Sequence, residues 1–334
     1  MVTRCSGGAM ILHRWVGANL LLAALLWAPV LHGAEKLNLG YAQGSGLWPF
    51  WVAIDGGYFK QNDLDVQAVM TGGSGVTMAG LISGDLFVSA GGSAAGVSLV
   101  GSGAAIVLIG RCGRPPFTLV TSDPTVRTIK DLRGKVITTG TGQSGDLVLR
   151  DLLQRNGMKV NDLQYIYQAD QQARYMSVLN QRAAAAVISP PYDLMARKAN
   201  LRELADFNTV GSPLMTCGIW VRKNNLEQRG ATLERFIRAY VQAVARFHLD
   251  RPFAVQSFLK HTRSKDMETA EHTYRRQVDL VPRKPYVIND ALQPLIDQAL
   301  EAKPDMKARK PEEFYDNRIV KKLDESGFID GLYK

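Results

Sequence analysis

Residues 36–41 read KLNLGY, residues 64–74 read LDVQAVMTGGS, and residues 86–93 read LFVSAGGS. Each stretch is a short apolar strand that ends in a small-residue turn and leads into a segment of helical length. In an open parallel α/β sheet the carboxyl ends of the strands and the amino ends of the helices share one edge. The three turns are therefore expected to place free backbone N–H groups and serine hydroxyls around one crevice, which is a ligand site by geometry.

The first 34 residues have the pattern of a secretory signal peptide. Arg4 and Arg14 come first, no acidic residue occurs before Glu35, and an apolar run occupies residues 16–27. This run is roughly a dozen residues, whereas a membrane-spanning helix needs about 20, so an uncleaved anchor is the weaker alternative. We expect cleavage near Ala34 and a periplasmic location.

Composition bounds the class of protein. The 334 residues are 46% hydrophobic and 21% charged, which is ordinary for a globular chain, and the length favours two domains. A formal net charge of +9 suits anionic solutes or a membrane surface, although a soluble basic surface is the simpler interpretation. No run of Lys and Arg with interleaved aromatic residues suggests nucleic acid.

Two cysteines, Cys112 and Cys217, would remain after removal of the signal peptide. An exported protein can oxidise such a pair if the fold brings the two thiols together. Nothing in the sequence requires that, and we expect two unpaired buried thiols.

A second series of strands and helices repeats the pattern of the first. Glycine turn 140–145 and the turn from Ser189 to Tyr192 each follow a predicted strand and open a predicted helix. The predicted strands are 135–139, 163–167 and 184–188, and the predicted helices are 146–156, 173–181 and 193–198.

The C-terminal third is predicted to be mostly helical. Phe236, Tyr240, Val244 and Phe247 recur at helical spacing and are expected to form a core stripe. Two similar α/β lobes followed by a helical tail imply two crossings between them, near 112–118 and 210–218, with a cleft between the lobes. The predicted lobes are residues 35–113 with 218–334, and residues 114–217.

Several motifs occur together along the chain: Gly40-Tyr41 leading to Trp51, DGGYFK at 55–60, GGS at 72–74, LISGD at 81–85 and IKDLRGKV at 129–136. With them the chain resembles the periplasmic solute-binding proteins of ABC importers, in the group that binds sulfonates, taurine, nitrate or thiamine-pyrimidine precursors. The resemblance spans Leu37 to about Lys322. It implies an α/β, two-lobed periplasmic-binding-protein fold of type II, with two crossovers and a helical C-terminal tail.

The resemblance also implies a function. Proteins of this group capture a small organic or inorganic anion by hinge closure and deliver it to an inner-membrane permease with a cytoplasmic ATPase. We expect a monomer that binds a small-molecule solute and no nucleic acid. A solute sensor of similar fold is the alternative, and a related thiamine-pyrimidine enzyme is disfavoured because the chain lacks the cysteine-rich iron motif and a histidine between residues 35 and 247.

The candidate solute contacts lie in the turns that open helices. There a serine either caps the helix or offers its hydroxyl to an anion, and these two roles are compatible. Trp48 either sandwiches an organic solute or caps the lobe core, and Tyr192 matches a position where the resembling proteins reach the solute. The candidate set is Ser45, Trp48, Gly73, Ser74, Gly92, Ser93, Thr141, Gln143, Ser144 and Tyr192.

Arg111 and Arg114 flank the first predicted crossing. A guanidinium there can pair with two oxygens of a sulfonate, carboxylate or phosphate. The alternative, which we favour, is a solvated charge at the hinge.

Other chemistries find little support. The GTGQSG sequence at 140–145 has the form of a dinucleotide fingerprint, but export and the late position of Asp170 argue against that ligand. All three histidines after residue 34 lie in the helical tail, so a serine nucleophile would lack its base. Glu268 and His272 form a single i, i+4 pair without further ligands. We expect no catalysis, no metal and no cofactor.

Overall fold

The computed structural model describes residues 1–3, 33–42, 47–114, 116–140, 144–168, 170–210, 214–308 and 310–334. Two compact units are distinguished, Met1–Glu35 and Lys36–Lys334. Most of the predicted signal peptide lies outside the described residues. Among the described residues, no helix combines the length and the apolar character that a membrane span requires.

The second unit contains two five-stranded mixed sheets. In the first sheet the strand order is β2-β1-β3-β10-β4, with β1 parallel to β3 and β10 antiparallel to both of its neighbours. Its strands are β1 (Glu35–Ala42), β2 (Leu64–Thr71), β3 (Val88–Ala90), β4 (Ile106–Arg111) and β10 (Gly218–Arg222).

The second sheet has the order β7-β6-β8-β5-β9, in which β6 is parallel to β7 and β8 while β5 is antiparallel to β8 and β9. The strands are β5 (Thr118–Thr121), β6 (Val136–Thr139), β7 (Gln164–Tyr167), β8 (Ala185–Ile188) and β9 (Arg202–Asp206). The chain thus enters the second sheet after β4 and returns to the first with β10. The lobe boundaries given above stay a prediction.

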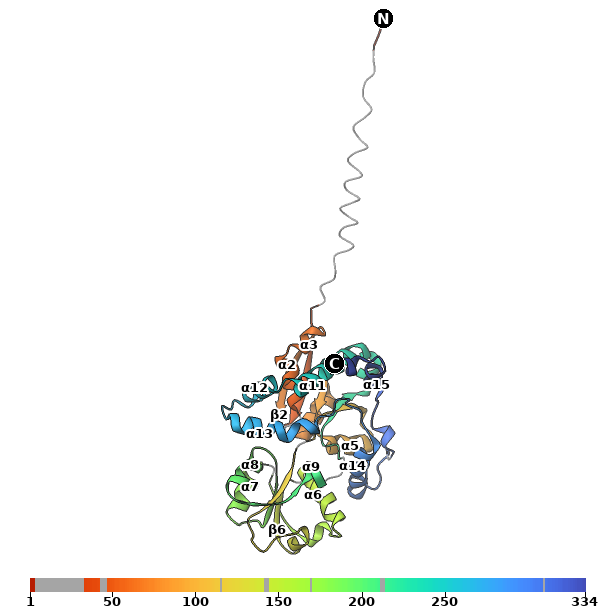
Figure 1. The fold of residues 1–334 in the computed structure, drawn as a ribbon. Helices are drawn as coiled ribbons and strands as arrows, with labels where there is room; N and C mark the ends of the chain where they lie inside the picture. The colour runs from red at the N-terminus through yellow and green to blue at the C-terminus, as the bar shows by residue number, and fades with distance from the viewer. Residues whose placement is uncertain are drawn as a thin grey trace. The chain divides into compact units, whose positions relative to one another are not determined.

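Helices flank both sheets (Figure 1). Those between the strands of the first sheet are α2 (Trp48–Asp55), α3 (Tyr58–Gln61), α4 (Ser74–Ser83) and α5 (Ser93–Gly101). Those of the second sheet are α6 (Ser144–Arg155), α7 (Gln171–Leu179), α8 (Tyr192–Lys198) and α9 (Phe207–Val210). The tail holds α10 (Lys223–Gln228), α11 (Gly230–Leu249), α12 (Arg251–Thr262), α13 (Met267–Gln277), α14 (Asn289–Ala302), α15 (Arg318–Glu325) and α16 (Phe328–Gly331).

The predicted mixed α/β architecture with a helical tail is confirmed, with local corrections. Strand β9 was not predicted, because its sequence RELAD is polar and only Ala205 is buried. On the return to the first sheet, residues 214–217 form no strand, since only Gly218–Arg222 pairs in the sheet. Helix α6 begins at Ser144, two residues earlier than predicted.

The core stripe of the longest helix is confirmed. Phe236, Tyr240, Val244 and Phe247 of α11 are fully buried in one hydrophobic cluster together with β4 and β10 side chains. A second cluster contains residues of both sheets, including Trp220 of β10 and Leu119 of β5. Continuous apolar packing therefore links the sheets at the point where the chain crosses between them.

His248, near the end of α11, is expected to make stability depend on pH. Burial lowers its pKa from the ordinary value of 6.5, and its Nε2 lies 2.9 Å from the Val281 carbonyl oxygen, which the neutral ring can satisfy as a donor. Below about pH 6.5 the unfolded chain binds a proton that the folded protein does not, so stability falls as pH decreases through this window and is unaffected above it.

We therefore expect His248→Gln, which keeps a donor for the carbonyl, to flatten this part of the profile. Urea unfolding of both proteins at several values between pH 7.5 and 5.5 tests it. Equal slopes for the two proteins would show that His248 does not contribute.

Candidate functional site

At one edge of the first sheet the structure brings two of the predicted turns together. A side-chain carbon added to Gly92 would lie 3.1 Å from the Cβ of Ser74, so the turn before α5 contacts the first residue of α4. Gly73 and Gly92 both have positive φ, 152° and 58°, which favours glycine at these two turns. The small residues thus allow two helix amino ends to lie side by side.

Ser93 opens α5 at this edge, yet it is only 1% exposed. Its Oγ lies 3.3 Å from where a Gly218 Cβ would be, and it has no hydrogen-bond partner among the described residues. A bulky residue here would therefore disturb packing as well as any ligand. Ser74 is half-buried and is the more accessible hydroxyl of this edge.

The second sheet presents a similar edge at the carboxyl ends of β6 and β8. Ser144 is half-buried at the start of α6, and the buried Oγ1 of Thr139, the last residue of β6, has no partner among the described residues. Ser189 is held by Gln171, whose Oε1 accepts from the Ser189 backbone N–H at 2.8 Å. Both parallel strands therefore end in polar side chains.

Tyr192 opens α8 beside the same edge. Its ring centroid lies 5.9 Å from that of Tyr175, and the hydroxyl pKa is raised by burial and by the negative charge of Asp170. Tyr192 is half-buried, so its hydroxyl stays protonated and able to donate.

Arg174 is a residue of this edge that the sequence analysis missed. It lies on α7, is 2% exposed, and donates from Nη1 to the Val187 carbonyl at 3.2 Å. The same Nη1 lies 3.5 Å from the position of an added Cβ on Gly145, so the guanidinium lies against the first turn of α6. Burial lowers its pKa, partly offset by Asp170. The sequence shows only that Arg174 lies four residues before the apolar Val178 and so shares its helix face, which does not by itself indicate a buried guanidinium.

Trp48 does not belong to the site. The side chain is 0% exposed, its Nε1 donates to the Ala254 carbonyl at 2.8 Å, and its ring packs against Phe247 and Phe258. The predicted solute contact is therefore wrong for this structure, because the first helix of the first sheet is held against α11 and α12 through this ring. Three other candidates, Ser45, Thr141 and Gln143, lie outside the described residues.

The expected pair of free thiols is also wrong. Cys112 and Cys217 form a disulfide with their Cα atoms 5.2 Å apart, and the Cys112 backbone N–H donates to the Cys217 carbonyl at 3.0 Å. The two crossings run side by side at this point, which a sequence separation of 105 residues conceals.

Arg111 and Arg114 line a pocket of about 330 Å³ beside these crossings. Burial lowers the pKa of both guanidinium groups, and the charge of Arg114 lowers that of Arg111 further. None of Ser74, Ser93, Ser144 or Tyr192 lines this pocket. Arg111 is nevertheless the last residue of β4, which runs parallel to β3, so the pocket begins at the same edge of the first sheet as the turn before α5. Both residues are half-buried and the Nε of Arg111 is fully buried, so the guanidinium of Arg111 is only partly solvated, and the role of these charges stays a prediction.

Helix α13 of the tail binds the second sheet through ion pairs. His272 Nε2 lies 2.9 Å from Asp193 Oδ2, and Arg276 Nε lies 3.3 Å from the same oxygen. Arg276 also forms a hydrogen-bonded pair with Asp206. Glu268 pairs with Lys198 at 2.6 Å, so Glu268 and His272 both contact partners on helix α8, which follows strand β8 of the second sheet.

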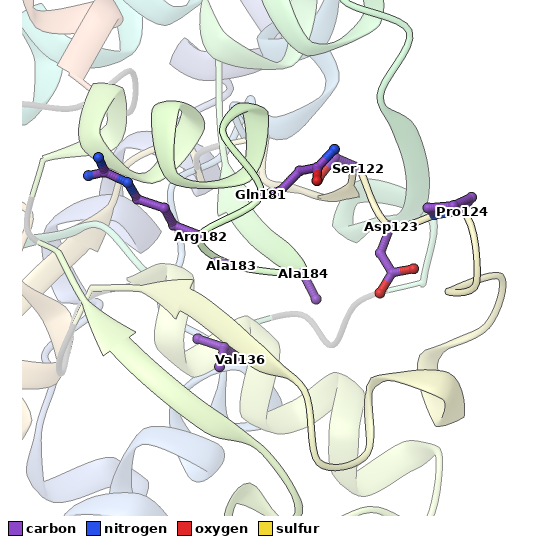
Figure 2. Close-up of a pocket in the computed structure, with 8 residues that line it drawn as sticks. All are labelled: Ser122, Asp123, Pro124, Val136, Gln181, Arg182, Ala183 and Ala184. Atoms are coloured by element: carbon purple, nitrogen blue, oxygen red, sulfur yellow. The ribbon is translucent and has the colours of Figure 1, made fainter.

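A second pocket, of about 400 Å³, lies at the other end of the second sheet (Figure 2). Val136 and Ala184 border it at the starts of β6 and β8, with Asp123 and Arg182 on opposite sides. Ser144 and Tyr192 follow the carboxyl ends of these strands, so this pocket lies at the opposite end of the sheet from those two predicted contacts. Asp123 is engaged by Lys135 at 2.9 Å.

The sequence profile of the family described as "NMT1/THI5 like" matches residues 46–252. The chain belongs to the NMT1/THI5-like family. No curated protein sequence gives a significant match. The match covers the second sheet, the crossings and the strands of the first sheet other than β1.

Solved structures show the same fold. The periplasmic aliphatic sulphonate binding protein SsuA from Escherichia coli is 18% identical, with a TM-score of 0.70 over 84% of this chain and 92% of its own. SsuA from Xanthomonas axonopodis pv. citri, bound to MOPS, is 19% identical with a TM-score of 0.67, covering 83% and 96%. The nitrate-binding protein NrtA from Synechocystis PCC 6803 is 10% identical with a TM-score of 0.66, covering 88% and 89%. The NMT1/THI5-like chain therefore has the periplasmic-binding-protein fold.

Proposed function

We infer that this NMT1/THI5-like protein is the extracytoplasmic solute-binding component of an ABC importer and captures a small organic or inorganic anion. The observation that carries the ligand class is the buried Arg174 against the first turn of α6. A helix amino end and a guanidinium in a low-dielectric setting both favour negative charge. The structural neighbours named for binding sulfonate or nitrate also support an anionic ligand.

The solute would lie between the two edges, with Ser74 and the glycine turns on one side and Ser144, Ser189 and Tyr192 on the other. Rotation about the crossings would bring the edges together, and a solute that touches both edges would favour the closed population. The protein itself would catalyse no reaction. It would deliver the solute from the periplasm to an inner-membrane permease that works with a cytoplasmic ATPase.

A thermal-shift screen tests this function. Alkanesulfonates, taurine, nitrate and aromatic carboxylates are added to the purified protein, and a ligand at ~100 times its Kd should stabilise it by about 2.7 kcal/mol. A saturable shift with one class supports the function and identifies the solute. No shift with any class, together with no small molecule released on denaturation and detected by mass spectrometry, would contradict it.

Ser144→Trp is expected to weaken binding of the solute found in that screen at least tenfold, because the indole would fill the space in front of the α6 amino end. The free energy of unfolding should fall by no more than about 1 kcal/mol, since Ser144 is half-buried at the first position of α6. Gln154→Trp, on an exposed position of the same helix, is the matched control and should bind normally. Equal affinities of the two variants in titration calorimetry would remove the α6 turn from the site.

A further inference from the structure

Helix α13 has two faces of different character. On one face Tyr274 is buried in the core cluster of the first sheet, and its hydroxyl donates to the Phe247 carbonyl at 2.9 Å. The opposite face carries Glu268, His272 and Arg276 at positions i, i+4 and i+8, a set that we call the α13 stripe. The helix therefore joins the first sheet by apolar packing and presents a row of polar side chains on its other side.

The partners of the α13 stripe are charged side chains of α8 and β9, and Figure 1 shows α13 next to α8. Glu268 lies 2.6 Å from Lys198 at the end of α8, and His272 lies 2.9 Å from Asp193 Oδ2 near its start. The arginine of the stripe lies 3.3 Å from the same oxygen and also pairs with Asp206 of β9. The Asp193 side chain is 4% exposed, whereas the Glu268 side chain is 60% exposed, so water has access to the contact from the Glu268 end.

A second joint between the sheets is apolar. Ala291 of α14 is buried in one cluster with Val97 of α5 and Leu119 of β5, and the Met215 N–H donates to the Ala291 carbonyl at 3.0 Å. By contrast, the cluster that buries one face of α13 has no described member between residues 118 and 210. Separating apolar surfaces exposes them to water, whereas charged groups that separate regain water as a partner. If the sheets rotate, the α13 contact is therefore the one that can open.

The last residue of α13 is fixed to the first crossing. Gln277 is fully buried, and its Nε2 donates to the Arg114 carbonyl at 3.0 Å. Glu268 lies near the other end of the helix, roughly 14 Å away at a rise of about 1.5 Å per residue. A rotation about the crossings displaces the Glu268 end furthest, so the contacts of the stripe would separate in order from that end.

We propose that the α13 stripe is a latch between the two sheets, which holds the second sheet in the orientation of this structure and releases when the sheets rotate apart. The inference deepens the proposed function, because it rests on rotation about the crossings. Asp193 directly follows Tyr192, the candidate solute contact that opens α8, so the latch also positions that contact. It would thereby set the fraction of molecules ready to bind solute without touching the solute.

Spin labels on the two sides of the latch test it in the absence of solute. Gln256→Cys on α12 and Gln172→Cys on α7 place labels at exposed positions, and after removal of residues 1–34 the disulfide leaves no other thiol. Double electron–electron resonance should give a narrow distance distribution for the otherwise wild-type protein. His272→Leu removes the contact with Asp193 at similar side-chain size and should broaden the distribution and shift it to longer distances. His272→Gln keeps a donor and should restore the narrow distribution.

Lys198→Glu is the second variant, and it decides the outcome if His272→Leu does not fold. It changes an exposed position and brings two negative charges together, so a smaller shift in the same direction is expected. The charge swap Lys198→Glu with Glu268→Lys should reverse that shift. His261→Leu is the matched control, because His261 Nε2 lies 3.2 Å from Asp55 Oδ2 and both residues belong to helices of the first sheet, α12 and α2. It should leave the distribution unchanged.

The distance measurement needs no solute, so its result does not depend on the solute screen. A latch that opens in His272→Leu and closes again in His272→Gln supports the inference even if none of the tested compounds binds. Unchanged distributions in both His272→Leu and Lys198→Glu would overturn it, and so would an equal broadening in His261→Leu, whatever the screen shows.

Discussion

Replacing both Cys112 and Cys217 by serine is expected to lower the free energy of unfolding by about 4 kcal/mol. The disulfide closes a loop with a sequence separation of 105 residues, and the chain-entropy model assigns about 4.7 kcal/mol to a loop of about 100 residues. Both side chains are also buried in the main core cluster, where serine adds the cost of a polar group. Urea unfolding of the two proteins under non-reducing conditions measures the difference.

The reductant supplies the control for this prediction. Adding it should bring the wild-type curve close to that of the double variant, while the curve of the double variant itself should not move. Alkylation of the unfolded, unreduced mature protein should label no thiol. Labelling of two thiols, or a difference below 1 kcal/mol, would contradict the assigned role of the bond.

Arg276→Met is expected to cost about 3 kcal/mol of stability. Its guanidinium faces Asp206 and Asp193 and also donates from Nη2 to Thr118 Oγ1 at 2.9 Å. The three charged side chains are between 4% and 17% exposed, so the variant leaves two carboxylates poorly hydrated and short of a partner. Removing one partner of a buried ion pair typically lowers stability by about 3–5 kcal/mol. Because the side chains around Arg276 are partly exposed, we expect a loss at the lower end of this range.

Arg275→Met provides the matched comparison for this residue. Arg275 is the preceding residue of α13, carries the same charge and is exposed. Its replacement should change stability by less than about 0.5 kcal/mol, as is usual for surface positions. If both variants unfold at the same urea concentration, the contact between α13 and the second sheet does not stabilise the protein.

The helix-opening turns illustrate what could be predicted locally. GGS at 72–74 and at 91–93 predicts a chain reversal before a helix, and the positive φ values of Gly73 and Gly92 agree. Strand β9 illustrates the limit, because an edge strand with one buried residue lacks the alternation by which strands are recognised.

Whether a given residue belongs to the site depended on tertiary neighbours, which a local sequence pattern does not show. Trp48 follows a turn of the expected kind, yet packing with Phe247 and Phe258 of the tail withdraws it from any solute. Arg174 was overlooked because a charged residue within a helix is usually solvated, whereas this one lies under Gly145. In both cases the deciding neighbours come from a distant part of the chain.

By itself, the sequence determined the alternation of strands and helices, the turns that open those helices, the core stripe of α11 and the resemblance to solute-binding proteins. These properties depend on backbone preferences and on hydrophobic spacing within about ten residues. The tertiary structure alone decided the pairing of Cys112 with Cys217, the ion pairs of α13 with α8 and β9, and the burial of Trp48 and Arg174. Such contacts can join residues 158 positions apart, and they form only where two complete sheets pack around continuous apolar side chains.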